Sequence, residues 1–183
     1  MMKSPGLFRI CASALVLIPG LTGCLGMPDG VRPVEDFDVN RYLGTWYEIA
    51  RLDHSFERGL INVSAEYSLR DDGGVRVVNR GFSTTDNQWE EANGKAYFVE
   101  SGETGYLKVS FFGPFYGSYV VFDLDQEDYQ YSFVSGPDTS FLWLLSRTRQ
   151  VPDEVLQRFM DSAKSLGFDT GGLILVEQNT GAD

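Results

Sequence analysis

Six turn-forming stretches divide most of this chain into short segments, and their spacing constrains the fold more than any other feature. They are RDDGG (70–74), TTDN (84–87), ESGETG (100–105), GPFYG (113–117), DQED (125–128) and SGPDTS (135–140). The runs between them are rich in Val, Tyr, Phe and Leu with the period-two alternation of strands. Eight strands fit between residues 44 and 147. This even spacing predicts an antiparallel meander closed into a barrel, or a two-sheet sandwich.

One amphipathic helix follows the strands, in residues 151–168. Pro152 lies near its first turn, Asp153 and Glu154 lie at the positive end of its dipole, and Gly167 ends it. Its apolar residues recur at spacings of three and four: Val155, Leu156, Phe159, Met160, Ala163 and Leu166. We expect this face to cover the apolar strand at 141–145. A last apolar run at 173–176 predicts a short ninth strand.

The first 23 residues have the features of a secretory signal peptide. Lys3 and Arg9 accompany an apolar run at 10–21, which as a helix would be roughly 18 Å long, whereas a hydrocarbon core is about 30 Å thick. The stretch LTGC at 21–24 resembles the lipobox of bacterial lipoproteins. That resemblance implies a lipoprotein signal peptide at 1–23, cut just before an acylated Cys24. The alternative is an ordinary secretory signal with an incidental cysteine.

Residues 24–36 are then expected to be an acylated N-terminus and a spacer, because residues 25–36 include two prolines and two glycines. The only other cysteine, Cys11, is removed with the leader, so the exported domain has no disulfide and no thiolate site. Two or more acyl chains hold a protein stably on a membrane. By resemblance to other lipoproteins, Leu25 after the cysteine implies the outer membrane, with the domain facing the periplasm.

The net charge of the chain is −11, and it becomes −13 when Lys3 and Arg9 are removed. Such a surface repels phosphodiester backbones, so nucleic acid is excluded as a partner. The single histidine, His54, is expected in a solvated loop, with no cysteine or serine arrangement around it that would make it catalytic. One histidine among scattered carboxylates is a poor metal site. We therefore predict no enzyme activity, no metal and no cofactor.

Three segments together indicate a family. RYLGTWYEIAR (41–51) contains Gly-x-Trp, FDLDQEDYQYSFVSGPD (122–138) joins two strands through an acidic turn, and LSRT (145–148) ends the eighth strand. Their order and spacing resemble the three conserved regions of the lipocalins, and the resemblance covers about residues 37–177. It implies an all-β fold with an eight-stranded up-and-down antiparallel β-barrel, a C-terminal α-helix packed outside it and a short final strand. The domain would occupy residues 37–183.

The lipocalin resemblance also implies structural roles for three residues. The tryptophan at the position of Trp46 plugs the closed end of the barrel, and the arginine at the position of Arg147 packs across it. Gly44 is expected to let the chain approach closely there. An arginine over an indole ring contributes about 0.5–2 kcal/mol. These residues are predicted to stabilise the barrel rather than to bind a ligand.

Small residues in the strand at 90–98 predict space inside the barrel, because Ala92, Gly94 and Ala96 alternate on one face with Phe98. Other strands supply aromatic and aliphatic side chains. The predicted lining of the calyx is Ala92, Ala96, Phe98, Val109, Phe111, Tyr119, Val121, Tyr131, Phe133 and Trp143. Apolar walls suit an acyl chain, whose burial is favourable by roughly 25 cal/mol per Å². The alternative is that these side chains fill a solid core.

These features predict a membrane-anchored lipocalin that stores or transports lipid. The family resemblance, and not the residues alone, favours a fatty acid or a lysophospholipid as ligand. The alternative is a structural or interaction module whose barrel is filled and has no physiological ligand. Its contact surface would be the aromatic hairpin FFGPFYGSY (111–119), which would touch a membrane or form a homodimer.

Overall fold

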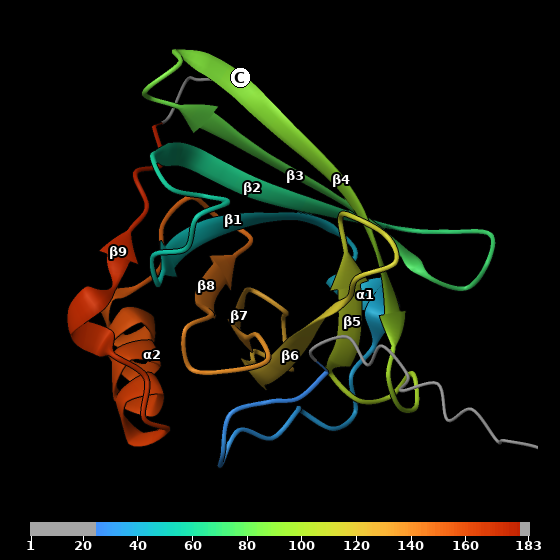
Figure 1. Ribbon diagram of the computed structural model, residues 1–183. Helices are drawn as coiled ribbons and strands as arrows, with labels where there is room; N and C mark the ends of the chain where they lie inside the picture. The colour runs from blue at the N-terminus through green and yellow to red at the C-terminus, as the bar shows by residue number, and fades with distance from the viewer. Residues whose placement is uncertain (1–24, 180–183) are drawn as a thin grey trace, which may run out of the picture.

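A computed structural model describes residues 25–179, and most of them form one closed β-barrel (Figure 1). The barrel consists of β1 (Gly44–Arg51), β2 (Leu60–Leu69), β3 (Val75–Ser83), β4 (Gln88–Phe98), β5 (Tyr106–Ser110), β6 (Gly117–Leu124), β7 (Tyr131–Ser135) and β8 (Leu142–Ser146). Each strand pairs antiparallel with the next, and β1 pairs with both β2 and β8, which closes the ring. The predicted up-and-down barrel is confirmed, and the sandwich is excluded.

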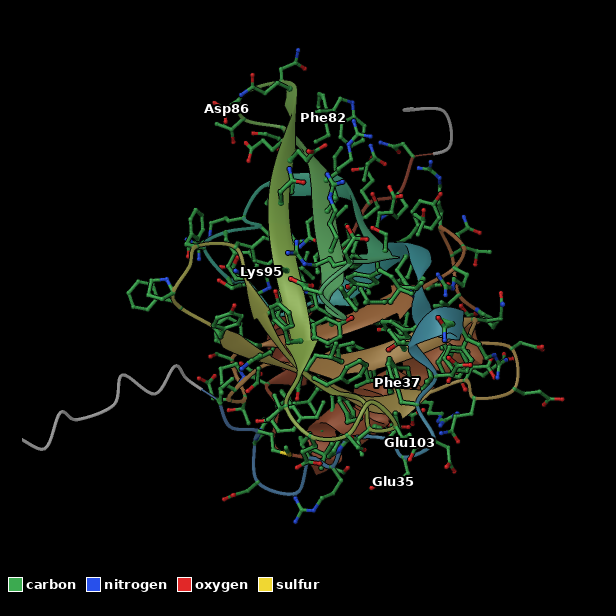
Figure 2. The ribbon with its side chains drawn as sticks, turned by 90° about the vertical axis from the view of Figure 1, so that its right-hand side faces the viewer. Glu35, Phe37, Phe82, Asp86, Lys95 and Glu103 are labelled. Atoms are coloured by element: carbon green, nitrogen blue, oxygen red, sulfur yellow. The ribbon has the colours of Figure 1, made fainter. Side chains whose placement is uncertain are left out.

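The two ends of the barrel differ, because connections in an up-and-down meander alternate between them. The loops at 52–59, 84–87, 111–116 and 136–141 share one end, which we call the open rim. The short helix α1 (Val39–Tyr42) lies at the other end, beside the start of β1, and we call this the closed end. In Figure 2 the loop after β5 projects on the left, while α1 lies on the right.

Strand alternation produces two apolar clusters, one inside the barrel and one outside it. On β8, Trp143 and Leu145 belong to the inner cluster, whereas Leu142 and Leu144 belong to the outer one. The outer cluster is covered by α2 (Asp153–Ser165), whose Phe159 is fully buried. All six apolar residues predicted for this helix belong to or pack against that cluster. The predicted packing of the helix outside the barrel is therefore confirmed.

The C-terminal segment completes the wall beside β1. After the 3₁₀ turn η1 (Thr170–Gly172), the short strand β9 (Ile174–Leu175) pairs with the end of β1. Beyond it, Gln178 Nε2 donates to the carbonyl oxygens of Glu48 and Val63, each at 2.8 Å. The tail thus lies between β1 and β2, where those two strands no longer pair with each other.

The segment before α1 is folded onto the barrel, which corrects the expectation of a spacer at 24–36. Val31 in this segment is fully buried in the outer cluster. Backbone hydrogen bonds join Val34 to Val121 and Phe37 to Glu103, both at 2.8 Å. Gly30 in this segment has a φ of +84°, and a Cβ on it would lie 3.3 Å from the Leu166 side chain of the outer cluster. Cys24 and the predicted leader lie outside the described residues. Within residues 25–179 no helix is long and apolar enough to cross a bilayer.

Candidate functional site: the barrel cavity

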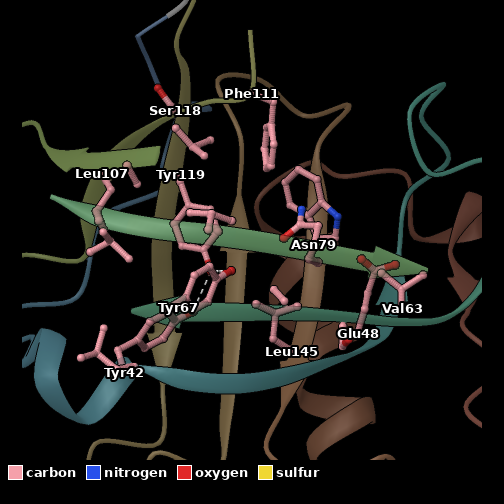
Figure 3. A pocket seen from close by; sticks show the side chains of 18 of the residues that line it. Tyr42, Glu48, Val63, Tyr67, Asn79, Leu107, Phe111, Ser118, Tyr119 and Leu145 are labelled. Atoms are coloured by element: carbon pink, nitrogen blue, oxygen red, sulfur yellow. Dashed lines mark hydrogen bonds between the residues drawn. The ribbon is translucent and has the colours of Figure 1, made fainter. Parts of the chain in front are cut away.

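The interior of the barrel contains a cavity of about 110 Å³, measured as the space open to the centre of a water molecule (Figure 3). A single water needs roughly 10–15 Å³ by the same measure, so the barrel is hollow rather than filled. Apolar side chains make up most of the wall. The cavity reaches the open rim, where Phe56, itself 58% exposed, belongs to its wall.

Five of the ten predicted lining residues lie on the wall of this cavity. They are Ala96, Val109, Phe111, Tyr119 and Trp143. They come from four strand regions, β4, β5 with the loop that follows it, β6 and β8, and strict alternation makes their side chains point inward. For these five residues the inward direction predicted from alternation is the one that the structure has.

Three other predicted residues do not reach the cavity. Phe98 and Val121 belong to the inner cluster toward the closed end, where the Phe98 ring lies 6.3 Å from that of Phe37. Ala92 is exposed, because β4 pairs with β5 only at residues 95–98 and its earlier part pairs with β3 alone. This part of the hairpin therefore extends beyond the ring, and a small residue there creates no internal space.

Tyr131 and Phe133 correct the predicted orientation of β7, since both lie in the outer cluster. The Phe133 ring lies 5.1 Å from that of Phe159 on α2, and the Tyr131 hydroxyl accepts a hydrogen bond from Arg158 at 2.7 Å. The inward residues of β7 include Ser132 and Val134. Both faces of this strand carry apolar side chains, so its pattern alone did not determine which face is covered by the helix.

The closed end is built around Trp46, which is fully buried. Its Nε1 donates to the carbonyl oxygen of Tyr42 at 2.8 Å, and the Arg147 guanidinium lies 3.9 Å above its ring. Arg147 also donates to the carbonyl oxygens of Thr45 and Arg41 at 2.9 and 2.6 Å. These contacts join α1, β1 and the end of β8 at one point.

Gly44 serves this closed end for a different reason from the expected one. Its φ is +89°, in the left-handed region that side-chain-bearing residues rarely adopt. A Cβ on Gly44 would meet its nearest neighbour, Arg147, at an ordinary 3.7 Å. The backbone conformation, and not a close approach, therefore requires glycine here.

Three tyrosines form the polar part of the cavity toward the closed end. The Tyr42 hydroxyl lies 2.8 Å from that of Tyr119 and 2.9 Å from Ser132 Oγ, and the Tyr67 and Tyr119 hydroxyls are 3.0 Å apart. Burial raises the pKa of Tyr42 to about 12 and also raises the pKa values of Tyr67 and Tyr119. The three hydroxyls therefore stay protonated, and Figure 3 shows them at the opposite end of the cavity from Glu48.

A buried charged cluster lies toward the open rim. Arg51 donates to Glu48 Oε1 and to the carbonyl oxygen of Glu57, both at 2.8 Å, and Glu57 Oε2 accepts from Trp143 Nε1 at 3.2 Å. Both carboxyl groups line the cavity. Burial, followed by the charge of Glu57, raises the pKa of Glu48 well above its usual range, and burial raises the pKa of Glu57. This cluster fastens the 52–59 loop to β1.

His54 belongs to the same cluster, which corrects the expectation of a solvated loop histidine. It is only 7% exposed, and its ring stacks on Phe56 with centroids 4.1 Å apart and lies 5.1 Å from Trp143. Its Nε2 lies 3.3 Å from Glu57 Oε2. Burial, and next the charge of Arg51, lower the pKa of His54 to about 4. The imidazole is therefore neutral at pH 7.

This burial predicts a pH dependence of stability that His54→Gln removes. The unfolded state takes up a proton near pH 6.5, whereas the folded state does so only near pH 4. The contribution of His54 is therefore complete above pH 6.5 and falls as the pH drops toward 4, by at most about 3 kcal/mol. Urea unfolding of both chains at several pH values measures the difference.

The comparison of the two chains is needed because Glu48 and Glu57 also make stability depend on pH. Their pKa values are raised in the folded state, so their contribution to the free energy of unfolding decreases as the pH rises. Their effect has the opposite sign and remains in the His54→Gln chain. We expect the unfolding free energy of the variant to decline less between pH 6.5 and pH 4. Parallel curves for the two chains would contradict a buried neutral histidine.

Several wall residues were not predicted. They lie on the inner face of strands, at the closed end or in the 52–59 loop at the open rim, and they include Phe37, Val39, Tyr42, Leu43, Glu48, Phe56, Glu57, Val63, Ala65, Tyr67, Val75, Val77, Asn79, Leu107 and Leu145. The alternation of β2 and β3 contained the signal for six of them. Asn79 Oδ1 is buried on the wall and has no hydrogen-bond partner within residues 25–179. It is thus an acceptor available to a ligand.

The distribution of polar groups on the wall suits the binding of an elongated apolar molecule. Within residues 25–179, no group of three or more histidine, cysteine, aspartate or glutamate side chains could hold a metal ion. The polar groups are few and lie at the two ends, and the apolar wall separates them. This is the arrangement expected for a molecule with a long apolar part.

Comparisons with known proteins agree with this geometry. The family model of the lipocalin-like domain matches residues 37–178. The outer membrane lipoprotein Blc of Vibrio cholerae is 60% identical over 172 residues, which cover 94% of this chain and 98% of that protein. The protein of the same name from Escherichia coli K12 is 54% identical over 151 residues, which cover 82% of this chain and 85% of that protein.

Among solved structures, insecticyanin of the tobacco hornworm Manduca sexta superposes with a TM-score of 0.68. The superposition covers 86% of this chain and 88% of that chain, at 24% identity. At this identity the likeness concerns the fold alone.

Proposed function

Since this chain belongs to the lipocalin family, we propose that it carries a single-chain lipid, a fatty acid or a lysophospholipid, at the bacterial outer membrane. The family is one of binding and transport proteins, and the chain is not an enzyme. The observation that carries the proposal is the hollow barrel, with a largely apolar wall that reaches the open rim. A hollow barrel favours a carrier over the interaction module with a filled interior.

The energetics of the wall support an acyl chain as the buried part of the ligand. Each methylene removed from water contributes about 0.8 kcal/mol, and the cavity has side chains such as Val77, Val109 and Leu145 to receive it. The five predicted lining residues on this wall are the proposed contacts. Ala96 and Val109 are opposite each other on β4 and β5, so they would touch the same part of the chain.

The buried charges constrain where the headgroup lies. Glu48 and Glu57 line the cavity near the open rim, and a ligand carboxylate beside them would be a third acidic group in one desolvated site. We infer that the acyl chain enters first and that an anionic headgroup stays at the mouth, in contact with water. The neutral acceptor Asn79 Oδ1 and the tyrosine hydroxyls remain available to polar groups inside.

The anchor is the second part of the proposal. The relatives named outer membrane lipoprotein support an outer-membrane location. Cys24 follows a signal-like leader and is the proposed acylation site, and Cys11 would be removed with that leader. A cysteine with more than one acyl chain would hold the domain stably, since one chain alone binds only marginally.

Native mass spectrometry tests the carrier function on a chain that begins at Leu25 and is purified without detergent. We expect a bound mass in the range of a fatty acid or a lysophospholipid, because the cavity should retain membrane lipid during expression. Titration of the delipidated protein with a fluorescent fatty acid, in competition with lysophospholipid, then ranks the two classes. A protein that emerges empty and binds neither class in the titration would contradict the proposal.

A further inference from the structure

The N-terminal segment runs along the outside of the barrel as a fixed strap. It is the segment 26–37, and its first fixed point is a hydrogen bond from the Gly26 backbone N–H to Ser118 Oγ at 2.9 Å. Further along, Val31 is fully buried, and the backbone of Val34 bonds to β6. The strap is therefore attached to the barrel at its first residue and again at Val31 and Val34.

The strap begins at the open rim. Ser118 is the second residue of β6, directly after the 111–116 loop. A Cβ built on Gly26 would lie 3.8 Å from the carbonyl oxygen of Pro137, which belongs to the 136–141 loop. Gly26 thus lies beside two rim loops, at the opposite end of the barrel from α1.

This position limits how far the rim can be from a membrane anchor at Cys24. Cys24 precedes Gly26 by two residues, which span at most about 7 Å when fully extended. The headgroup layer on each side of a bilayer is roughly 5–8 Å thick. Acyl chains attached at Cys24 would therefore bring the open rim to the headgroup layer.

The rim carries exposed apolar side chains of the kind that this layer accepts. Phe112 is 82% exposed and Phe115 is 66% exposed, and Phe56 and Leu25 are also exposed. Residues 111–122 contain no charged side chain, although the chain has a net charge of −11. The rim charges lie on the other loops, where Asp53 pairs with Arg58 at 2.6 Å. The aromatic loop can therefore approach an anionic surface that repels most of the molecule.

We propose that the open end of the barrel faces the bilayer, with Phe112 and Phe115 in the headgroup layer. A single-chain lipid would then pass between bilayer and cavity without exposing its chain to water, which costs about 0.8 kcal/mol for each methylene. This orientation rests on the acylation of Cys24 proposed above. The partner is a lipid surface, and a second copy of the chain on the same loop is the competing occupant.

Two cysteine variants of the acylated full chain test the orientation, because the processed chain has no cysteine besides Cys24. Phe115→Cys places a fluorophore on the rim, and Asp128→Cys places one on the exposed β6–β7 turn at the closed end. The proteins are reconstituted in vesicles that contain lipids with a nitroxide in the headgroup region. We expect strong quenching at position 115 and almost none at position 128.

Equal quenching at the two positions, or stronger quenching at 128, would overturn the orientation. If two Phe115→Cys chains form a disulfide and the lipid does not quench the fluorophore, the 111–116 loop contacts a second copy of the chain. This result would also overturn the proposed orientation. Thermal unfolding of both variants must match that of the parent chain, and Tyr116→Cys replaces Phe115→Cys if it does not.

A fractionation experiment separates failure of the anchor from failure of the orientation. Cys24→Ser should release the chain from the membrane fraction, while the parent chain stays there. If the parent chain is itself found outside the membrane fraction, both the proposed anchor and the orientation fail. If it is anchored and position 115 is not quenched, only the orientation fails, and the carrier proposal stands.

Discussion

Replacing Trp46 by alanine will lower the free energy of unfolding by about 3–5 kcal/mol, the range for a fully buried tryptophan. The loss has three sources: the cavity left by the indole, the unmade bond to the Tyr42 carbonyl oxygen, and the missing ring beneath Arg147. For a domain of this size, the melting temperature should fall by about 6–20 °C. Thermal and urea unfolding measure both quantities.

Trp89→Ala is the matched control, since this tryptophan is 41% exposed and lies at the start of β4. We expect it to cost less than about 1 kcal/mol, because its contacts are an edge contact with Phe82 and the guanidinium of Arg80. An unchanged melting temperature for Trp46→Ala would refute the assignment of this residue to the closed end. If Trp46→Ala and Trp89→Ala lowered the free energy of unfolding by similar amounts, the loss could not be attributed to the contacts of the closed end.

Replacing Ala96 by tryptophan will block the cavity and weaken the binding of a fluorescent fatty acid by about a hundredfold. An indole at this position would displace about four methylenes of the ligand, or about 3 kcal/mol of burial. Because Ala96 faces a hollow, the larger side chain has space, and the fold should be retained. Fluorescence titration measures the affinity, and circular dichroism confirms the barrel.

Ala92→Trp on the same strand is the control for that substitution. Ala92 is exposed in the part of β4 that pairs with β3 alone, so its replacement should leave the affinity within about twofold. Equal affinities of the two variants for the fatty acid would mean that the ligand binds outside the barrel. If Ala96→Trp unfolds, Val109→Phe on the opposite strand provides a smaller obstruction of the same space.

The architecture could be predicted from the sequence because its turn signals and its helix are local features. The closed-end residues Trp46 and Arg147 were identified through a family resemblance, since they are 101 residues apart and no local pattern links them. On β7 and β8 neighbouring residues are apolar on both faces, such as Phe133 with Val134 and Trp143 with Leu144, so alternation alone did not determine which face is inside. The predicted inward direction proved right for Trp143 and wrong for Phe133.

The rest of the site depended on tertiary contacts that composition does not encode. Ala92, Gly94 and Ala96 look equivalent in the sequence, yet only Ala96 lines the cavity. Gly94 instead accommodates the ring of Phe111, which would lie 2.8 Å from a Cβ. His54 was expected in solvent, but Phe56, Trp143 and Glu57 surround it. The segment before α1 was expected to be a spacer because its attachment to β6 is long-range.

The C-terminal tail completes the barrel wall at the point where β1 and β2 part. β1 pairs with β2 only at residues 44–47. Beyond this point the tail bonds to both strands: the Val176 N–H donates to the Ile49 carbonyl oxygen at 2.9 Å, the Asn62 N–H donates to the Glu177 carbonyl oxygen at 2.8 Å, and Gln178 Nε2 donates to Glu48 and Val63. Each such bond contributes about 0.5–1.5 kcal/mol. Because Glu48 and Val63 line the cavity, its enclosure on this side depends on a segment more than a hundred residues away in the chain.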